Sequence, residues 1–217
     1  MALDGELPET LVVGVGYPSR RSLKATSDRA FLLRSYDLTP IRDLSEETMV
    51  GKWLKVKKVA TGGAESLVSM LRDQLMPFIE RRYRSDSTRR VIVGHSFGGL
   101  FTLHALFSDH RLFKGYVAAS PSLWYGERIM FRREEDYAGH HSRLPVHLFL
   151  AAGDREDEAN HQMASNVVHF AAKLRSRRYA GLQLSTALLP DCGHSASVAS
   201  AYQVGLHSVL VQGRAAT

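Results

Sequence analysis

The stretch RRVIVGHSFGGLFTLHAL, from Arg89 to Leu106, joins two apolar runs through a glycine-rich turn that holds one serine, Ser96. The first run, Arg90 to Gly94, is short and rich in valine and isoleucine, which is typical of a buried strand. The second run, Phe97 to Phe107, is long enough for a helix packed against the centre of a sheet. The stretch therefore predicts a strand, a sharp turn and a helix, with the serine at the turn.

The turn Gly94-His-Ser-Phe-Gly98 matches the pattern G-x-S-x-G in the setting that gives it meaning, after a strand and before a helix. Such a turn strains the backbone of the serine, and glycine neighbours avoid clashes there. Ser96 would stand above the carboxyl edge of the sheet and at a helix N-terminus, where the Phe97 amide can bind an oxyanion. Ser96 is thus predicted to be a nucleophile; the alternative is an incidental serine in a glycine-rich turn.

A serine nucleophile needs a general base, which α/β-hydrolases supply in the chain order serine, acid, histidine. His194 lies in a turn, Pro190-Asp-Cys-Gly-His194, between the last strand-like run and the last predicted helix, so we expect it to be that base. His95 sits inside the serine turn and is expected to face away from the hydroxyl. We count His95 among the candidate substrate-binding residues.

The acid is expected in the loop Gly153-Asp-Arg-Glu-Asp-Glu158, directly after the predicted strand Val146 to Ala151. An orienting carboxylate fixes the imidazole tautomer and stabilises its cation. Glu156 fits best because the acid commonly sits three residues after the glycine that ends this strand; Asp154 is the second choice and Asp157 the third. A serine–histidine pair without a working acid stays open at this point.

Residues 1–217 are predicted to form one α/β domain with a mainly parallel sheet and helices on both faces, because strand-like and helical runs alternate. The further strand-like runs are Leu11 to Gly16, Tyr116 to Ala119 and, less clearly, Leu182 to Leu189. Helical spacing predicts helices over Gly63 to Tyr83, bent at Pro77, over Asn160 to Arg175 and over Ser195 to Val211. Tyr17 to Gly62 is irregular and predicts a lid, a binding loop or a surface segment.

Composition excludes several classes of protein. The 217 residues are 44% hydrophobic and 23% charged, which is ordinary for a globular domain. No apolar run approaches the roughly 20 residues that cross a bilayer, and the first residues lack signal-peptide features, so we expect a cytoplasmic protein without a membrane partner. The single cysteine, Cys192, excludes an internal disulfide and a cysteine-built metal site. We expect no metal and no cofactor.

The net charge of +6 comes largely from arginine clusters. Such clusters attract nucleic acid or small anions. No recognised nucleic-acid motif accompanies them, so a solvated surface is the favoured reading and we expect no nucleic-acid partner.

The chain resembles the putative-esterase family of α/β-hydrolases, which includes the enterochelin (siderophore) esterases and the esterase D type enzymes. The matching pieces are Leu11-Val-Val-Gly-Val-Gly-Tyr17, Arg34-Ser-Tyr-Asp-Leu-Thr-Pro40, Gly62-Gly-Ala64, Gly94-His-Ser-Phe-Gly-Gly99, Ser120-Pro-Ser-Leu-Trp124, Gly153-Asp-Arg-Glu156 and Gly193-His194. The resemblance implies that Ser96 attacks an ester carbonyl, that His194 shuttles the proton and that water hydrolyses the acyl-enzyme. The implied partner is a small-molecule ester, with siderophore lactones as the expected class.

The resemblance also implies that Trp124 walls the substrate pocket and that Arg34 and Asp37 shape the loop opposite. Ordinary core packing for Trp124, and a structural ion pair for Arg34 and Asp37, are the alternatives. Acyl transfer to an alcohol and a noncatalytic binding scaffold are the competing functions.

The beginning of the chain departs from the family. Relatives usually have further strands and a Leu-Asp-Gly turn whose amide is the second oxyanion donor, but here Leu3-Asp-Gly5 lies too close to Leu11 to be that turn. We therefore expect the opening strands to be missing and the Tyr17 amide to be a substitute donor. An uncovered sheet edge would allow pairing into a homo-oligomer.

Overall fold

The computed structural model describes residues 7–17, 23–159 and 161–211. The described residues divide into two compact units, Leu11–Ser85 and Met1–Thr10 with Asp86–Thr217. None of the helices in these ranges is long and apolar enough to cross a membrane.

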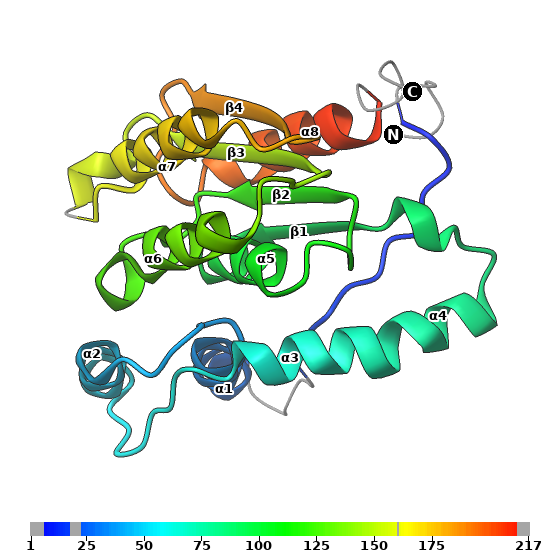
Figure 1. The fold of residues 1–217 in the computed structure, drawn as a ribbon. Helices are drawn as coiled ribbons and strands as arrows, with labels where there is room; N and C mark the ends of the chain where they lie inside the picture. The colour runs from blue at the N-terminus through cyan, green and yellow to red at the C-terminus, as the bar shows by residue number, and fades with distance from the viewer. Residues whose placement is uncertain (1–6, 18–22, 160, 212–217) are drawn as a thin grey trace. The chain divides into compact units, whose positions relative to one another are not determined.

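The unit that contains Ser96 is built on a parallel sheet of four strands (Figure 1). The strands follow one another in space as they do in sequence: β1 (Val91–His95), β2 (Gly115–Ala119), β3 (His147–Gly153) and β4 (Gln183–Leu189). The register pairs His95 with Ala119 and Ala119 with Ala151, so the carboxyl ends of these strands lie side by side. The segments that follow the strands therefore meet at one edge of the sheet, as predicted.

Helices cover both faces of this sheet. Their bounds are α5 (Phe97–Ser108), α6 (Tyr125–His140), α7 (Met163–Arg177) and α8 (Ser197–Leu210), with short 3-10 turns at Ser87–Arg89 and Glu156–Ala159. Helix α8 packs against the face that carries Val117 and Phe149, and Figure 1 shows α5, α6 and α7 on the opposite face. The predicted helices after Ser96, before Arg175 and after His194 are confirmed. Helix α6 was not predicted, because its sequence is rich in charged residues.

The Leu11–Ser85 unit is helical, with α1 (Leu23–Asp37), α2 (Leu44–Leu54), α3 (Ala64–Met70) and α4 (Met76–Arg82). A π-helical turn, Leu71–Leu75, joins α3 to α4, and the Met76 N–H donates to the Leu71 carbonyl five residues back. Proline has no N–H and its ring collides with the carbonyl four residues earlier, so the wider turn just before Pro77 relieves that conflict. The predicted helix over Gly63 to Tyr83 is confirmed, with a π-helical turn just before Pro77.

Two expectations for this unit are wrong. Residues 11–16 do not form a strand: they are extended and largely exposed, Val12 by 86%, and no described strand pairs with them. A strand is stable when it pairs with a neighbouring strand, and the composition of one apolar run does not show whether such a neighbour is present. The region from Tyr17 to Gly62 is not irregular either, because it contains α1 and α2. The Asp43 carboxylate caps α2 by accepting from the Ser45 and Glu46 amides, a signal that the sequence did hold.

Candidate active site

Ser96 lies between β1 and α5 in a strained conformation, with φ 61° and ψ −121°. A Cβ atom on Gly94 would come within 2.1 Å of the Gly98 carbonyl oxygen, so only glycine fits at position 94. A Cβ on Gly98 would meet nothing within 4 Å. The expected steric need for glycine therefore holds on one side of the serine and not on the other. The Phe97 amide belongs to the first turn of α5, where N–H groups have no partner within the helix.

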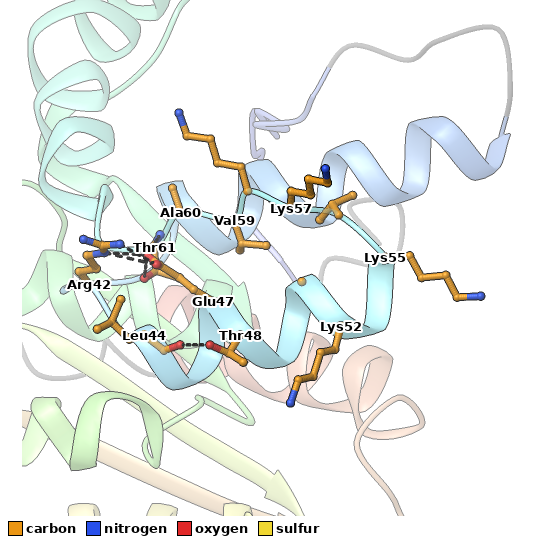
Figure 2. A pocket seen from close by; sticks show the side chains of 13 residues that line it. Arg42, Leu44, Glu47, Thr48, Lys52, Lys55, Lys57, Val59, Ala60 and Thr61 are labelled. Atoms are coloured by element: carbon orange, nitrogen blue, oxygen red, sulfur yellow. Dashed lines mark hydrogen bonds and ion pairs between the residues drawn. The ribbon is translucent and has the colours of Figure 1, made fainter.

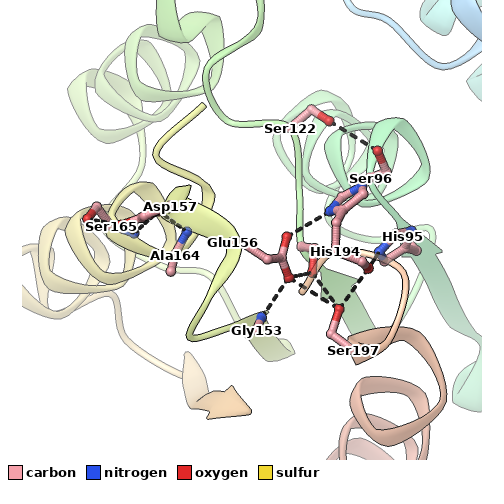
Figure 3. Close-up of polar contacts among 11 residues, drawn as sticks. His95, Ser96, Ser122, Gly153, Glu156, Asp157, Ala164, Ser165, His194 and Ser197 are labelled. Carbon is pink, nitrogen blue, oxygen red and sulfur yellow. Dashed lines mark hydrogen bonds and ion pairs between the residues drawn. The ribbon is translucent and has the colours of Figure 1, made fainter. Parts of the chain in front are cut away.

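A carboxylate and an imidazole meet beside this turn. Glu156 follows β3 and His194 follows β4, and the Glu156 Oε2 to His194 Nδ1 distance is 2.7 Å (Figure 3). Glu156 is 2% exposed. A buried carboxylate needs hydrogen-bond donors on both oxygens, and here it has them.

The second oxygen of Glu156, Oε1, is held by three donors. The Ser120 hydroxyl and the Gly153 amide both donate to it at 2.6 Å, and the Ser197 hydroxyl lies at 3.2 Å. Burial by itself raises the pKa of Glu156, but the hydrogen bonds from His194, Ser120 and Gly153 outweigh burial and hold the pKa below its ordinary value. The group is therefore a carboxylate at neutral pH. An acceptor at this position requires a proton on His194 Nδ1, which leaves Nε2 with the lone pair.

The backbone of His194 is fixed as well. Its carbonyl oxygen lies 2.9 Å from His95 Nε2 and 3.0 Å from the Ser197 hydroxyl. Because a carbonyl only accepts, His95 Nε2 carries a proton. The two imidazole rings are 4.4 Å apart between centroids. His95 therefore contacts the segment that carries His194, 99 positions along the chain, and its place in a turn does not reveal this contact.

The loop that carries His194 also packs against the end of β3. A Cβ on Gly153 would come within 2.1 Å of the Cys192 carbonyl oxygen. That oxygen accepts from the Arg155 amide at 3.2 Å, and the Asp154 amide donates to the Leu189 carbonyl at 3.0 Å. The acid and base loops are therefore held together along their backbones. Cys192 itself packs beside the core cluster, in agreement with its reading as a packing residue.

The Ser96 hydroxyl points toward a second serine. Its oxygen is 3.5 Å from Ser122 Oγ, and Figure 3 shows the contact. The Ser122 amide donates to the Ser96 carbonyl at 3.3 Å, and Ser122 is buried. Among the described residues there is no hydrogen bond between Ser96 and His194.

The other two candidate acids are occupied or exposed. Asp157 accepts from the Ala164 and Ser165 amides at the start of α7, which makes it a helix cap. Asp154 is exposed. Of the three candidates, Glu156 is the one whose carboxylate bonds to His194.

Aromatic rings lie next to the serine turn. The Phe97 and Trp124 ring centroids are 6.3 Å apart, and Trp124 stacks on His161 at 4.5 Å with 20° between the planes. Trp124 is half-buried, so one part of the indole remains accessible. The sequence did not single out His161. Its role as a stacking partner depends on folding and left no local signal.

Tyr17 and Arg34 belong to the Leu11–Ser85 unit, and their predicted roles at the serine stay predictions. Burial, and then the hydrogen bond with Asp37, raise the pKa of the Tyr17 hydroxyl. Asp37 thus contacts Tyr17 within this unit.

Sequence reasoning missed three serines that contact the site: Ser120, Ser122 and Ser197. A signal existed for the first two, because Ser120-Pro-Ser122 directly follows the buried strand β2 at the carboxyl edge. The signal for Ser197 was weaker, because the sequence shows only that it lies three residues after His194. Within the described ranges, no group of three His, Cys, Asp or Glu side chains could hold a metal ion.

Comparison with known proteins assigns this chain to a family. The family model described as "Putative esterase" matches residues 34–194. The chain belongs to this family. It is 27% identical over 192 residues to the ferri-bacillibactin esterase BesA of Bacillus subtilis, covering 88% of this chain and 63% of that protein. It is 34% identical over 175 residues to the siderophore enterobactin esterase of Emericella nidulans, covering 77% of this chain and 54% of that protein.

The chain thus spans less than two thirds of the length of either relative. Among solved structures, the BES protein from Bacillus cereus superposes with a TM-score of 0.77 over 96% of this chain and 72% of that one, at 24% identity. This likeness and the parallel sheet with helices around it identify the α/β-hydrolase fold, as expected.

Proposed function

We propose that this member of the esterase family is a serine hydrolase that cleaves carboxylic esters through an acyl-enzyme. The observation that carries the proposal is the 2.7 Å bond between buried Glu156 and His194, at the sheet edge where Ser96 stands in a strained turn. Strain at a serine between strand and helix has a cost, and it is typical of functional sites.

The reaction begins when the Ser96 hydroxyl turns from Ser122 to His194. As its oxygen attacks the ester carbonyl carbon, Nε2 of His194 takes the proton and Glu156 stabilises the resulting cation. The oxyanion accepts from the Phe97 amide, and the Tyr17 amide is the proposed second donor. The ester C–O bond then breaks, and the alcohol leaves with the proton from His194. Water then attacks the acyl carbonyl while His194 takes its proton; the bond between the acyl group and Ser96 Oγ breaks, the carboxylic acid leaves, and His194 returns the proton to Ser96.

Three further side chains act as positioning residues in this scheme. Ser120 and Ser197 hold Oε1 of Glu156, so that Oε2 stays directed at His194. His95 and Ser197 hold the His194 carbonyl, which fixes the segment that carries the imidazole. The proton on Nδ1 and the lone pair on Nε2 follow from these contacts.

We propose siderophore lactones as the substrate class. Two relatives are named as esterases of bacillibactin and enterobactin compounds. Trp124 is half-buried, lies 6.3 Å from the Phe97 ring beside the serine turn, and offers an aromatic surface suited to the aryl groups of such esters. We further propose that the protein is cytoplasmic, that it forms a single domain and that two copies pair through a sheet edge. Among the described residues, β1 and β4 are the edge strands.

An active-site fluorophosphonate probe tests the proposal. We expect one phosphonylated residue, Ser96, and no labelling of Ser96→Ala, while the matched variant Ser122→Ala keeps its labelling. A folded wild-type chain that stays unlabelled would favour the noncatalytic scaffold and sink the mechanism. A panel of aryl esters, trilactones and acyl thioesters, with and without added alcohols, then separates substrates and distinguishes hydrolysis from acyl transfer.

A further inference from the structure

The first turn of helix α6 is left-handed. Its residues Gly126, Glu127 and Arg128 have φ values of 55°, 51° and 62° and ψ values of 45°, 48° and 41°. L-residues other than asparagine and aspartate rarely visit this region, because the Cβ atom then lies too close to the following carbonyl oxygen. Glu127 and Arg128 both carry long side chains, so the turn is strained. Such strain persists only where surrounding contacts hold the backbone in place.

One side chain holds this turn. Arg132 lies one turn further along α6 and donates from Nη1 to the Glu127 carbonyl at 2.6 Å and from Nη2 to the Gly126 carbonyl at 2.8 Å. The planar guanidinium serves two acceptors in one fixed geometry, which the ammonium group of a lysine does not. The two bonds join consecutive carbonyl groups of the strained turn to the regular part of the helix. Arg132 therefore stabilises a backbone conformation that the turn residues by themselves disfavour.

The left-handed turn directly adjoins Trp124 and its buried neighbour. The Arg128 amide donates to the Trp124 carbonyl at 3.2 Å, so the turn is anchored on the backbone of Trp124. Tyr125 lies between them; it is fully buried and packs edge-on against Phe97 at 5.7 Å between ring centroids. The Tyr125 amide donates to the Ser122 carbonyl at 3.1 Å. The backbone before the turn is therefore fixed, and the turn determines how the chain leaves it.

The indole of Trp124 is less constrained than the ring of Tyr125. It is half-buried and stacks on His161, which is itself exposed. A ring packed in the core has one tightly defined position, whereas a ring stacked on an exposed partner can reorient with a small change of its backbone. Loss of the left-handed turn would therefore appear first in the orientation of Trp124. The Phe97 ring, 6.3 Å away, places this indole beside the serine turn.

We propose that Arg132 is a positioning residue for Trp124: by holding the left-handed turn it fixes the indole beside the serine turn, and so limits the size of the ester group that fits next to Ser96. This limit on size rests on the proposed function, because it needs an ester that reacts at Ser96. The positioning of the indole does not, because it can be measured in any folded chain. Arg132 touches no reacting atom in this scheme and acts through Trp124.

Fluorescence tests the positioning of the indole. The sequence holds two tryptophans, Trp53 and Trp124, so the full chain carrying Trp53→Phe reports on Trp124 alone. In this background we expect Arg132→Gln to raise the acrylamide quenching constant by about twofold, because the freed indole is more accessible, and Arg132→Lys to have an intermediate effect. Arg111→Gln removes an exposed arginine outside α6 and is the control. An unchanged quenching constant in an Arg132→Gln chain with normal helix content by circular dichroism would overturn the proposal.

Two backbone variants separate the turn from the charge of Arg132. Glu127→Val keeps Arg132 but places a β-branched side chain at φ 51°, where it fits poorly, so we expect the same rise in quenching as in Arg132→Gln. Glycine adopts left-handed values without a steric cost, so Glu127→Gly together with Arg128→Gly should lower the quenching constant of Arg132→Gln toward its parent value. Normal quenching in a folded Glu127→Val chain would contradict the proposal, and so would failure of the glycine pair to rescue.

Steady-state kinetics test the limit on size with two para-nitrophenyl esters, the small acetate and the large benzoate. We expect Arg132→Gln to change the ratio of kcat/KM for the two esters by about fivefold or more, through the KM of the benzoate, with kcat for the acetate little changed. An equal loss with both esters would indicate a general structural role and would overturn the role in specificity. A parent chain that turns over neither ester would count against the proposed function, and fluorescence would still decide whether Arg132 positions Trp124.

Discussion

The two units use charge in opposite ways. At the carboxyl edge of the sheet a single buried carboxylate, Glu156, has donors on both oxygens and fixes one imidazole. In the Leu11–Ser85 unit four exposed lysines, Lys52, Lys55, Lys57 and Lys58, line a hollow beside α2 and have no described carboxylate partner (Figure 2). A buried, fully bonded charge sets geometry, whereas exposed and unpaired charges set a field. Changes at Glu156 should therefore act through geometry and turnover, and changes at the lysines through the surrounding field.

The largest effect is expected from Glu156→Gln. The amide keeps the shape of the side chain but has a single oxygen, which can accept either from Ser120 and Gly153 or from His194 Nδ1 and not from both sides. With the NH2 group facing Nδ1 the wrong imidazole tautomer is favoured, and kcat/KM should fall by about 10³–10⁴-fold. Steady-state kinetics on an aryl ester measure it. Asp154→Asn, an exposed neighbour, is the control. A loss below tenfold for Glu156→Gln would mean that Ser96 and His194 work as a pair without an acid.

A smaller effect is expected when the His194 carbonyl loses a donor. His95→Leu removes the N–H that lies 2.9 Å from that oxygen, and we expect kcat to fall by about 10–100-fold with KM little changed. His95→Gln restores an N–H donor and should recover part of the activity. A raised KM with normal kcat would instead support the predicted contact of His95 with substrate.

Crowding the joint between the acid and base loops should cost stability. Gly153→Ala places a methyl group within 2.1 Å of the Cys192 carbonyl oxygen, and we expect a loss of about 1–3 kcal/mol in the free energy of unfolding. The control is Gly193→Ala, next to Cys192 in the loop that carries His194, where an added Cβ would meet nothing within 4 Å. Urea denaturation compares the two. Equal stability would show that the backbone can separate there without cost.

The smallest effect concerns a buried acid in the other unit. Glu46 is 4% exposed; burial, and then the neighbouring Asp43, raise its pKa from 4.5 to about 7. The folded unit thus binds a proton that the unfolded chain has released between these values, so its stability falls as pH rises from 4.5 through 7. Glu46→Gln should remove this fall and raise the midpoint of thermal unfolding at pH 8 by roughly a few degrees. An unchanged pH dependence of the midpoint would contradict the shift.

The sequence predicted those parts of the site that depend on local pattern. Ser96, Glu156 and His194 each follow a strand of one parallel sheet, and the carboxyl ends of parallel strands bring such segments to one edge. Contacts between distant segments left no comparable signal. Ser120 contacts Glu156, which lies 36 positions further along the chain, and Ser197, which lies 77 positions further along. No spacing rule links these residues.

The same reasoning explains the errors in the fold. Residues 11–16 have the composition of a strand, but pairing is a property of two segments and not of one. Helices α1 and α2 contain many polar residues, and the Asp43 cap was the one local indication of α2. The contact of His95 with the His194 carbonyl joins positions 99 residues apart, so the turn around Ser96 did not indicate it.

Ser197 has a single hydroxyl hydrogen and two acceptors within reach, the His194 carbonyl at 3.0 Å and Glu156 Oε1 at 3.2 Å. His95 also serves the first acceptor, and Ser120 the second. The hydrogen can therefore switch between the two oxygens by rotation of one hydroxyl, without movement of any heavy atom and without leaving either oxygen bare. In the proposed reaction, a change of charge on the imidazole would be accommodated by rotation of this hydroxyl dipole, which would keep the reorganisation energy of proton transfer small.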